Sequence, residues 1–267
     1  MISRKFAKKL RIETLKMTHH GRSSHIGSIL SIIDIVAVLY CRILKLRPGN
    51  LKNNDRNRFI LSKGHAGAAV YAALAFLGFF SKKKLMSHCK NGSNLSGHIS
   101  HINLPGVEFS TGSLGHGLSV GCGFAFASKL KKEKSKTFVL LSDGECNEGS
   151  TWEAAMFAGH HKLKNLVAII DYNKLQSLTT TTKTLNLEPF KKKWESFGWD
   201  CKLIDGHNHK ILEKNFSTKS KNKPKCFIAS TIKGKGVSFM ENKVLWHYRS
   251  PNILELKKAL EEVKNAR

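Results

Sequence analysis

The stretch LLSDGECNEGSTWEAAMFAGHHKLKNLVAIIDYNKLQ, residues 140–176, decides the fold. Its two ends belong to the apolar runs 137–141 and 166–171, which are typical of strands buried on both faces. The residues between them have a helical pattern over 151–162. A strand, a helix and a second strand within this length predict one right-handed βαβ unit, whose two strands are parallel.

The helix of this unit is expected to begin near Thr151. Ser150 and Glu153 have the S-x-x-E spacing of a capping box, in which each side chain bonds a free backbone N–H group of the first turn. Gly144 stands in the turn before the helix, where the absence of a Cβ atom allows an anion to approach the backbone. The N-terminus of the helix also favours anions.

The same plan recurs along the chain. Apolar runs at residues 58–62, 201–204 and 226–231 are each followed by a turn of small or polar residues, and 66–77 has a helical pattern. Strands separated by helices predict an α/β fold, with a parallel sheet covered by helices on both faces. We expect one domain over residues 1–267, closed by an amphipathic helix over 252–267. Ligands of such sheets lie beyond the carboxyl ends of the strands.

Two residues of the central stretch suit a metal ion. Asp143 follows the first strand and Asn173 the second, 30 residues later, so the crossover places both at one edge of the sheet. A carboxylate and an amide carbonyl are hard oxygen ligands of the kind that Mg²⁺ or Ca²⁺ binds, with phosphate oxygens completing the shell. Either residue alone is an ordinary turn residue; together, in this unit, they favour a metal site.

The motif Asp-Gly-Glu-Cys-Asn-Glu-Gly at residues 143–149, followed by Asn173 after the second strand, resembles the thiamine diphosphate signature of the transketolase family. The resemblance implies thiamine diphosphate as cofactor, held through Mg²⁺ (or Ca²⁺ or Mn²⁺). Asp143 and Asn173 would be side-chain ligands of the metal, and Leu175 would supply its backbone carbonyl. Gly144 would lie at the diphosphate, and Glu148 at the cofactor site in a network that contacts another subunit.

Four of the thirteen histidines match the same family pattern. His25 in GRSSHIGSILS and His98 in LSGHISH resemble the histidines that meet the substrate hydroxyls, so we expect them to be catalytic. His65 in LSKGHAGAAVY and His247 in a Trp-His-Tyr-Arg context resemble those that contact the diphosphate. Imidazole suits both tasks, because it donates hydrogen bonds to phosphate and exchanges protons near neutral pH.

The segment Thr-Gly-Ser-Leu-Gly-His-Gly at residues 111–117 resembles the glycine-rich loop of the family. The resemblance implies that the backbone of Gly112, Ser113 and Leu114 contacts the cofactor. The chain departs from the family where the usual proline is Ser113, the usual glutamine is His116, and the usual glycine before the metal-binding aspartate is Ser142. Backbone contacts tolerate these changes, and Ser142 does not stand at a ligand position.

The resemblance extends from about residue 16 to residue 251, but only to the diphosphate-binding domain of a transketolase. It implies transfer of a two-carbon ketol unit from a ketose or ketose phosphate to an aldose or aldose phosphate. The pyrimidine-binding and C-terminal domains would then belong to a second subunit, in an α2β2 assembly that is active only when both chains are present.

Two alternatives stay open at this point. One is a subunit of another thiamine diphosphate enzyme, similar to 1-deoxyxylulose-5-phosphate synthase or to a 2-oxo acid dehydrogenase; the set of His25, His65 and His98 favours ketol transfer over both. The other is a non-catalytic binder of anions or nucleic acid, suggested by the formal charge of +26. The basic residues are scattered in short groups without interleaved aromatic residues, which disfavours nucleic acid as the partner.

The remaining composition fits a cytoplasmic protein. The six cysteines contain no C-x-x-C pair, which disfavours a zinc site or a redox dithiol. The basic N-terminus has no apolar run behind it, so we expect no secretory signal. The most apolar stretch, residues 26–46, carries Asp34, Arg42 and Lys45 and is therefore better interpreted as a buried helix than as a membrane span.

Overall fold

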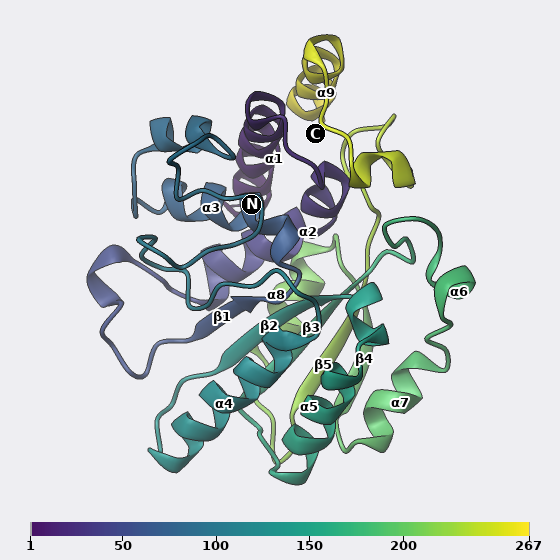
Figure 1. Ribbon diagram of the computed structural model, residues 1–267. Coiled ribbons are helices and arrows are strands. Elements are labelled where there is room, and N and C mark those ends of the chain that lie inside the picture. Colours follow the sequence, from purple (N-terminus) through teal and green to yellow (C-terminus); the bar gives the residue numbers. More distant parts are fainter. Residues whose placement is uncertain (1, 267) are drawn as a thin grey trace.

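A computed structural model describes residues 2–266 and contains, within them, a parallel sheet of five strands in the order β1-β2-β3-β5-β4 (Figure 1). All neighbouring strands pair in parallel register. The prediction of a parallel α/β sheet is therefore confirmed. The strands are β1 (Arg58–Leu61), β2 (Thr137–Ser142), β3 (Leu166–Tyr172), β4 (Asp200–Asp205) and β5 (Lys225–Ser230).

Helices cover both faces of the sheet. One face packs against α2 (Ile26–Val38), α3 (Gly67–Phe76) and α8 (His209–Ser217). The other packs against α4 (His116–Leu130), α5 (Gly149–His160) and α7 (Phe190–Ser196). Strand residues alternate between the two cores: Phe138 and Leu140 of β2 face the first and Val139 and Leu141 the second, as the two-residue period of a strand requires.

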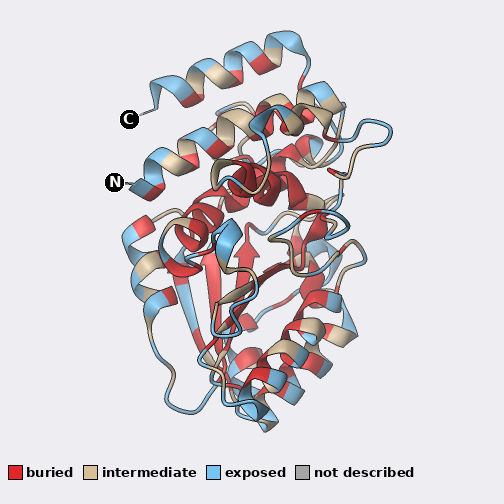
Figure 2. Ribbon diagram, turned by 90° about the vertical axis from the view of Figure 1, so that its left-hand side faces the viewer, coloured by how far each residue is buried: buried red, intermediate tan, exposed pale blue. Residues whose placement is uncertain are grey.

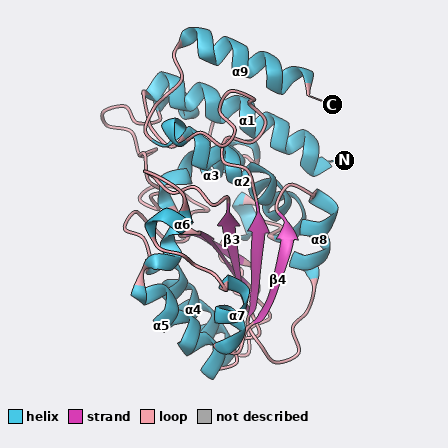
Figure 3. Ribbon diagram, turned by 90° about the vertical axis from the view of Figure 1, so that its right-hand side faces the viewer, coloured by secondary structure: helices cyan, strands magenta, loops and turns pink. Residues whose placement is uncertain are grey.

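A further layer lies outside α2. The first helix, α1 (Ile2–Gly21), packs on α2 and α3, and the last one, α9 (Ile253–Asn265), packs on α1, so that both termini of the described chain lie on this side (Figure 3). The capping box that begins α9 joins Asn252 and Glu255. The expected C-terminal helix is therefore present, although residue 267 lies outside the described part.

The most apolar stretch of the chain is a core helix. Helix α2 continues as a π-helix over Leu39–Ile43, and this 18-residue segment is long and apolar enough to cross a membrane. Of that segment, however, 89% is buried inside the protein, between the sheet and α1 (Figure 2). Burial of this kind is typical of a core helix and agrees with the sequence interpretation.

The start of α5 differs from the prediction. The helix begins at Gly149, after a short 3-10 helix over Gly144–Asn147, and its N-cap, Glu148, makes no side-chain capping bond. The prediction that Ser150 and Glu153 form a capping box was wrong, because the Ser150 hydroxyl donates instead to the carbonyl of Gly115 at 3.0 Å. A tertiary contact has replaced the local one.

Two long connections contain little regular secondary structure, one before α4 and one after β3 that includes the four threonines at residues 179–182. No helix or strand occurs within residues 88–115 of the described chain. The threonine run contains a single helical turn, α6 (Thr181–Thr184), which the Thr180 hydroxyl caps by accepting from the backbone of Lys183. Other short 3-10 segments are Pro48–Asn50, Gly64–Ala66, Lys82–Ser87 and Val244–His247.

A buried ionic cluster joins the outer layer to the sheet. Asp34 of α2 pairs with both terminal nitrogens of Arg11 of α1, at 3.1 and 2.6 Å. It also accepts from His207 at 2.8 Å and from His209 at 2.9 Å, both near the end of β4. Although burial raises the pKa of Asp34, Arg11 and the two histidines outweigh it and hold that pKa well below its usual range.

Arg11→Met is expected to lower the free energy of unfolding by about 3–5 kcal/mol at pH 7, because it leaves a buried carboxylate without its main partner. The pKa of Asp34 is lower in the folded than in the unfolded chain. The pair therefore stabilises the fold fully above pH ~4, the value of a free aspartate, and loses this effect as the pH falls further. Urea unfolding at pH 7 and pH 3 checks both points.

The matched control is Lys16→Met on the same helix, which removes a partly exposed pair with Glu13. Its cost is expected to stay below about 1 kcal/mol at either pH. An Arg11→Met effect no larger than that of Lys16→Met would contradict the assignment.

Candidate functional site

A cavity of about 490 Å³ opens where the carboxyl ends of the strands meet the loops that follow them. It is the place at which a parallel sheet presents its polar strand-end residues. The segments after β1, β2, β3 and β5 all contribute to its wall. The predicted site residues that line it are His25, His65, His98, Gly112, Leu114, Asp143, Gly144, Glu148, Asn173, Leu175 and His247.

Asp143 stands at the oxygen-rich end of this cavity. Its carboxylate accepts two short hydrogen bonds from backbone N–H groups, those of Gly144 and Lys174, each at 2.7 Å. Burial, followed by the negative charge of Asp171, raises the pKa of Asp143 to about 7. An acid raised by burial and a like charge gains from a bound cation, which would compensate both.

Asn173 and Leu175 present further oxygens beside it. The Asn173 carbonyl oxygen accepts from the backbone N–H of Leu175 at 3.0 Å, and the Leu175 carbonyl accepts from the Lys233 ammonium at 3.1 Å. That carbonyl thus already faces a positive charge. Residues 2–266 contain no group of three or more His, Cys, Asp or Glu side chains suited to a metal. A metal here would rely on one carboxylate, one amide and one backbone carbonyl, a set that fits Mg²⁺.

Four histidines, His25, His65, His98 and His247, also line the cavity. The ring of His25 lies 5.1 Å from that of His65, 5.6 Å from that of His98 and 4.9 Å from that of His247, between centroids. His25 has a left-handed backbone, with φ of 74°, and its N–H donates to the carbonyl of His247 at 2.8 Å. This bond connects the start of α2 to the last loop of the site.

Three of these histidines, His25, His65 and His247, are held in their neutral forms. Burial lowers the pKa of His25 to about 4 and that of His247 to about 3, and it holds the pKa of His65 well below its usual range. Nearby positive charges act in the same direction; they are those of Lys63 and Lys233. Neutral imidazoles at physiological pH can both donate and accept a hydrogen bond, as contact with phosphate and sugar hydroxyls requires.

The glycine-rich loop is clamped from two sides. Gly115, with φ of 83°, donates its N–H to the buried carboxylate of Glu145 at 2.9 Å and accepts from Ser150. A Cβ atom at Gly115 would come within 2.4 Å of the Ser150 hydroxyl, so only glycine fits. Gly112 and Leu114 line the cavity, whereas Ser113 is exposed and lies outside its lining.

The sequence interpretation missed four buried charged side chains of this region, which are Lys63, Lys233, Glu145 and Asp171. Lys63 and Lys233 are only 1% exposed, and the glutamate, Glu145, is fully buried. The two lysines follow β1 and β5, so the rule that strand ends carry the site was sufficient to indicate them. Lys233 donates to the carbonyls of Leu175 and Gln176 and lies 3.0 Å from Nδ1 of His247.

Comparison with known proteins agrees with this geometry. The family model described as "Transketolase, thiamine diphosphate binding domain" matches residues 2–260. The chain is 40% identical over 259 residues to one of the subunits of the apulose-4-phosphate transketolase of Phocaeicola vulgatus, a match that covers 96% of this chain and 92% of that protein. It is 40% identical over 225 residues to the 6-deoxy-6-sulfo-D-fructose transketolase subunit SqwG of a Clostridium species, covering 84% and 82%.

The fold is similar to that of longer chains as well. The transketolase of Campylobacter jejuni superposes with a TM-score of 0.91 at 31% identity, over 98% of this chain and 43% of that one. The chain therefore spans most of the length of the two subunits, but less than half of the C. jejuni transketolase chain.

Proposed function

We propose that this chain, which belongs to the transketolase family and corresponds to its thiamine diphosphate-binding domain, is the metal- and diphosphate-binding subunit of a split transketolase. The observation that carries the proposal is the meeting of three oxygen ligands with two buried lysines and four histidines in one cavity. We propose further that residues 1–267 act as one domain, in the cytoplasm.

The residues divide the cavity into a metal end and a diphosphate end. Asp143, Asn173 and the Leu175 carbonyl would hold Mg²⁺, or Ca²⁺ or Mn²⁺ in its place. Lys233 would neutralise the diphosphate, and the other predicted contacts would complete its binding. Those contacts are His65, His247, Gly144 and the backbone of Gly112, Ser113 and Leu114. Glu148 would lie at the cofactor site in the network that contacts the other subunit.

Thiamine diphosphate, when bound, supplies the carbanion chemistry of ketol transfer, and the protein supplies binding, orientation and proton handling. His25 and His98 line the same cavity, with ring centroids 5.6 Å apart. A sugar chain placed between them would meet two imidazoles that bind its hydroxyls and exchange protons with them. A ketose phosphate as donor and an aldose phosphate as acceptor suit this basic chain.

The relatives support a second subunit. Two of them are named as transketolase subunits, and this chain covers 92% and 82% of them. It covers 43% of the C. jejuni transketolase. We propose that the partner carries the pyrimidine-binding and C-terminal domains, and that the two chains assemble as α2β2. The names of these relatives also make a sugar phosphate or a sulfo sugar the first substrates to assay.

Calorimetry separates this function from anion or nucleic-acid binding. Thiamine diphosphate is expected to bind the chain in the presence of Mg²⁺ and far more weakly in EDTA, whereas duplex DNA at the same ionic strength is expected to bind weakly. Tight binding of DNA together with no uptake of the cofactor would overturn the proposal.

Lys233→Met is expected to weaken thiamine diphosphate binding by about 10–100-fold at pH 7, since a hydrogen bond to a charged group contributes about 1.5–3 kcal/mol. Burial and the charge of Lys63 lower the pKa of Lys233 to about 8, so its ammonium is mostly protonated at pH 7 and loses its proton above pH 8. The matched control, Lys235→Met, removes a lysine two residues away that pairs with Glu241. An equal loss in both variants would refute a specific contact.

A further inference from the structure

A buried lysine and a buried aspartate lie directly beneath the metal end of the cavity. Lys63 Nζ lies 2.5 Å from a carboxylate oxygen of Asp171, and the two side chains are 1% and 0% exposed. The lysine also donates to the carbonyl of Ser28 at 3.3 Å. Burying such a pair carries a large desolvation penalty, and hydrophobic residues of the same size often stabilise a core equally well. This favours a role beyond stability.

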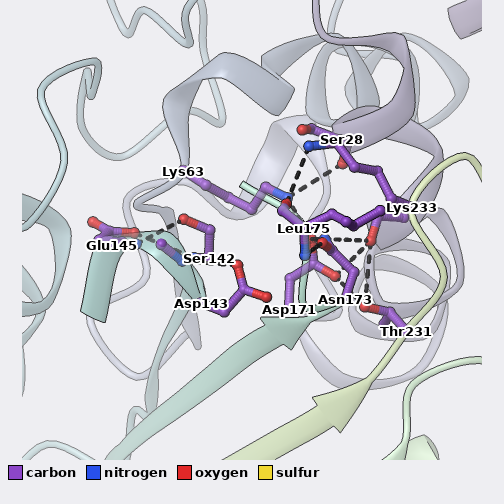
Figure 4. Close-up of polar contacts among 12 residues, drawn as sticks. Ser28, Lys63, Ser142, Asp143, Glu145, Asp171, Asn173, Leu175, Thr231 and Lys233 are labelled. Atoms are coloured by element: carbon purple, nitrogen blue, oxygen red, sulfur yellow. Dashed lines mark hydrogen bonds and ion pairs between the residues drawn. The ribbon is translucent and has the colours of Figure 1, made fainter. Parts of the chain in front are cut away.

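Asp171 receives four hydrogen-bond donors from four parts of the fold, and Figure 4 shows Lys63, Asn173 and Thr231 gathered around it. One oxygen accepts from Ser31 of α2 at 2.6 Å and from Thr231 after β5. The other accepts from Lys63 after β1 and from the side-chain amide of Asn173 at 3.1 Å. With both oxygens saturated and no exposed surface, Asp171 cannot itself coordinate a metal in the cavity.

The contact with Asn173 determines which end of that amide faces the cavity. The carboxylate of Asp171 can only accept hydrogen bonds, so it requires the NH₂ group of Asn173 on its side. Ser31 donates its proton to Asp171 and accepts from the same NH₂ group at 3.2 Å. On the opposite side the Leu175 N–H, which can only donate, requires the amide oxygen. A flipped amide would be repelled at both ends and would present a donor, not an oxygen, to a cation.

We propose that Asp171 is a positioning residue, which holds the Asn173 side chain with its amide oxygen toward the metal, and that Lys63 is the counter-ion that keeps this acceptor in place. The role rests on the proposed metal site. The net charge of the Lys63–Asp171 pair is zero, so the pair orients the ligand without changing the net charge around the cavity. Outer-shell partners of this kind usually change metal affinity by about 10–100-fold when removed.

Two double variants of the full chain isolate the orienting contact from the ion pair. Lys63→Met combined with Asp171→Asn leaves a neutral acceptor for Asn173, and Lys63→Met combined with Asp171→Leu leaves none. Both lack the lysine, both are neutral at these positions, and the three side chains at position 171 are similar in size. Lys63→Met alone is the reference that keeps the carboxylate.

The readout is the affinity for Mn²⁺ at saturating thiamine diphosphate, measured from the electron paramagnetic resonance of free Mn²⁺. The leucine double variant is expected to bind Mn²⁺ about 10–100-fold more weakly than the asparagine double variant, with the thermal unfolding temperatures of the two close together. Equal Mn²⁺ affinities in the two double variants would overturn the role, whatever their stabilities, since a purely structural pair would change the unfolding temperature alone.

If the leucine variant does not unfold cooperatively, Ser31→Ala tests instead whether the acceptors of the Asn173 amide determine the metal affinity. It removes one acceptor of the Asn173 amide and retains the ion pair, so Mn²⁺ affinity should fall at least about threefold; unchanged affinity would overturn the role. If the unmodified chain takes up no Mn²⁺ with thiamine diphosphate, the proposed function fails and this role with it. If it does, and the variants do not differ, only the role fails.

Discussion

Asp143→Ala is expected to remove metal-dependent binding of thiamine diphosphate. Asp143 is the only carboxylate among the three proposed metal ligands, so the variant loses both a coordination bond and the negative charge that attracts the cation. The loss should be at least about 100-fold in cofactor affinity with Mg²⁺ present, because the removal of an outer-shell partner alone usually costs about 10–100-fold in metal affinity. The affinity in EDTA, where no metal contributes, should change little.

Calorimetry with Mg²⁺ and with EDTA measures this difference directly. The variant should lose affinity for the cofactor without losing folding stability. Burial raises the pKa of Asp143 to about 7, so the ionised acid is costly to keep in the folded chain, and its removal does not destabilise the fold. Asp205→Ala is the matched control, because Asp205 also ends a strand but is exposed and outside the cavity. Normal Mg²⁺-dependent affinity in Asp143→Ala would remove the metal assignment.

His25→Asn is expected to lower kcat/KM for ketol transfer by about 10²–10⁴-fold in the complete enzyme, the usual contribution of a positioned acid–base group. Burial lowers the pKa of His25 to about 4, so its ring is neutral at assay pH and can accept a proton from a hydroxyl. Asparagine is chosen because His25 has φ of 74°, a conformation that asparagine tolerates better than alanine. The variant should fold normally and bind the cofactor with little change.

His101→Asn is the control for that result. His101 belongs to the same histidine-rich loop as His98 but is exposed and does not line the cavity. Its kcat/KM should stay within about threefold of the unmodified enzyme, as expected of a surface substitution. If His25→Asn binds the cofactor more weakly, and this weaker binding explains its whole loss of activity, His25 would serve in binding and not in proton transfer.

The sequence was sufficient to predict the parallel sheet and the edge of that sheet at which the site lies. Each strand is an apolar run that ends in a polar turn, so Asp143 and Asn173 could be placed together from the period and the crossover rule alone. Local rules were weaker where tertiary contacts compete with them. Ser150 has the spacing of a capping residue, but its hydroxyl donates a hydrogen bond to the nearby carbonyl of Gly115 instead.

The contact between Lys63 and Asp171 was beyond prediction for a different reason. The two residues are 108 positions apart, and each taken alone is a common strand-end residue. Only the side-chain positions show that the lysine points under the sheet edge. They also show that other donors saturate Asp171, although it stands two residues before the proposed ligand Asn173. Sequence spacing indicates which edge of the sheet carries chemistry; it does not indicate which acid there is free.

Ketol transfer by this chain before and after mixing with its partner subunit tests the central claim most directly. The assay supplies a ketose phosphate, an aldose phosphate, thiamine diphosphate and Mg²⁺, and follows the new ketose. We predict negligible turnover by either chain alone and full turnover by the equimolar mixture, with dependence on both the cofactor and the metal. Full ketol transfer by the isolated chain, or none by the mixture, would contradict the account.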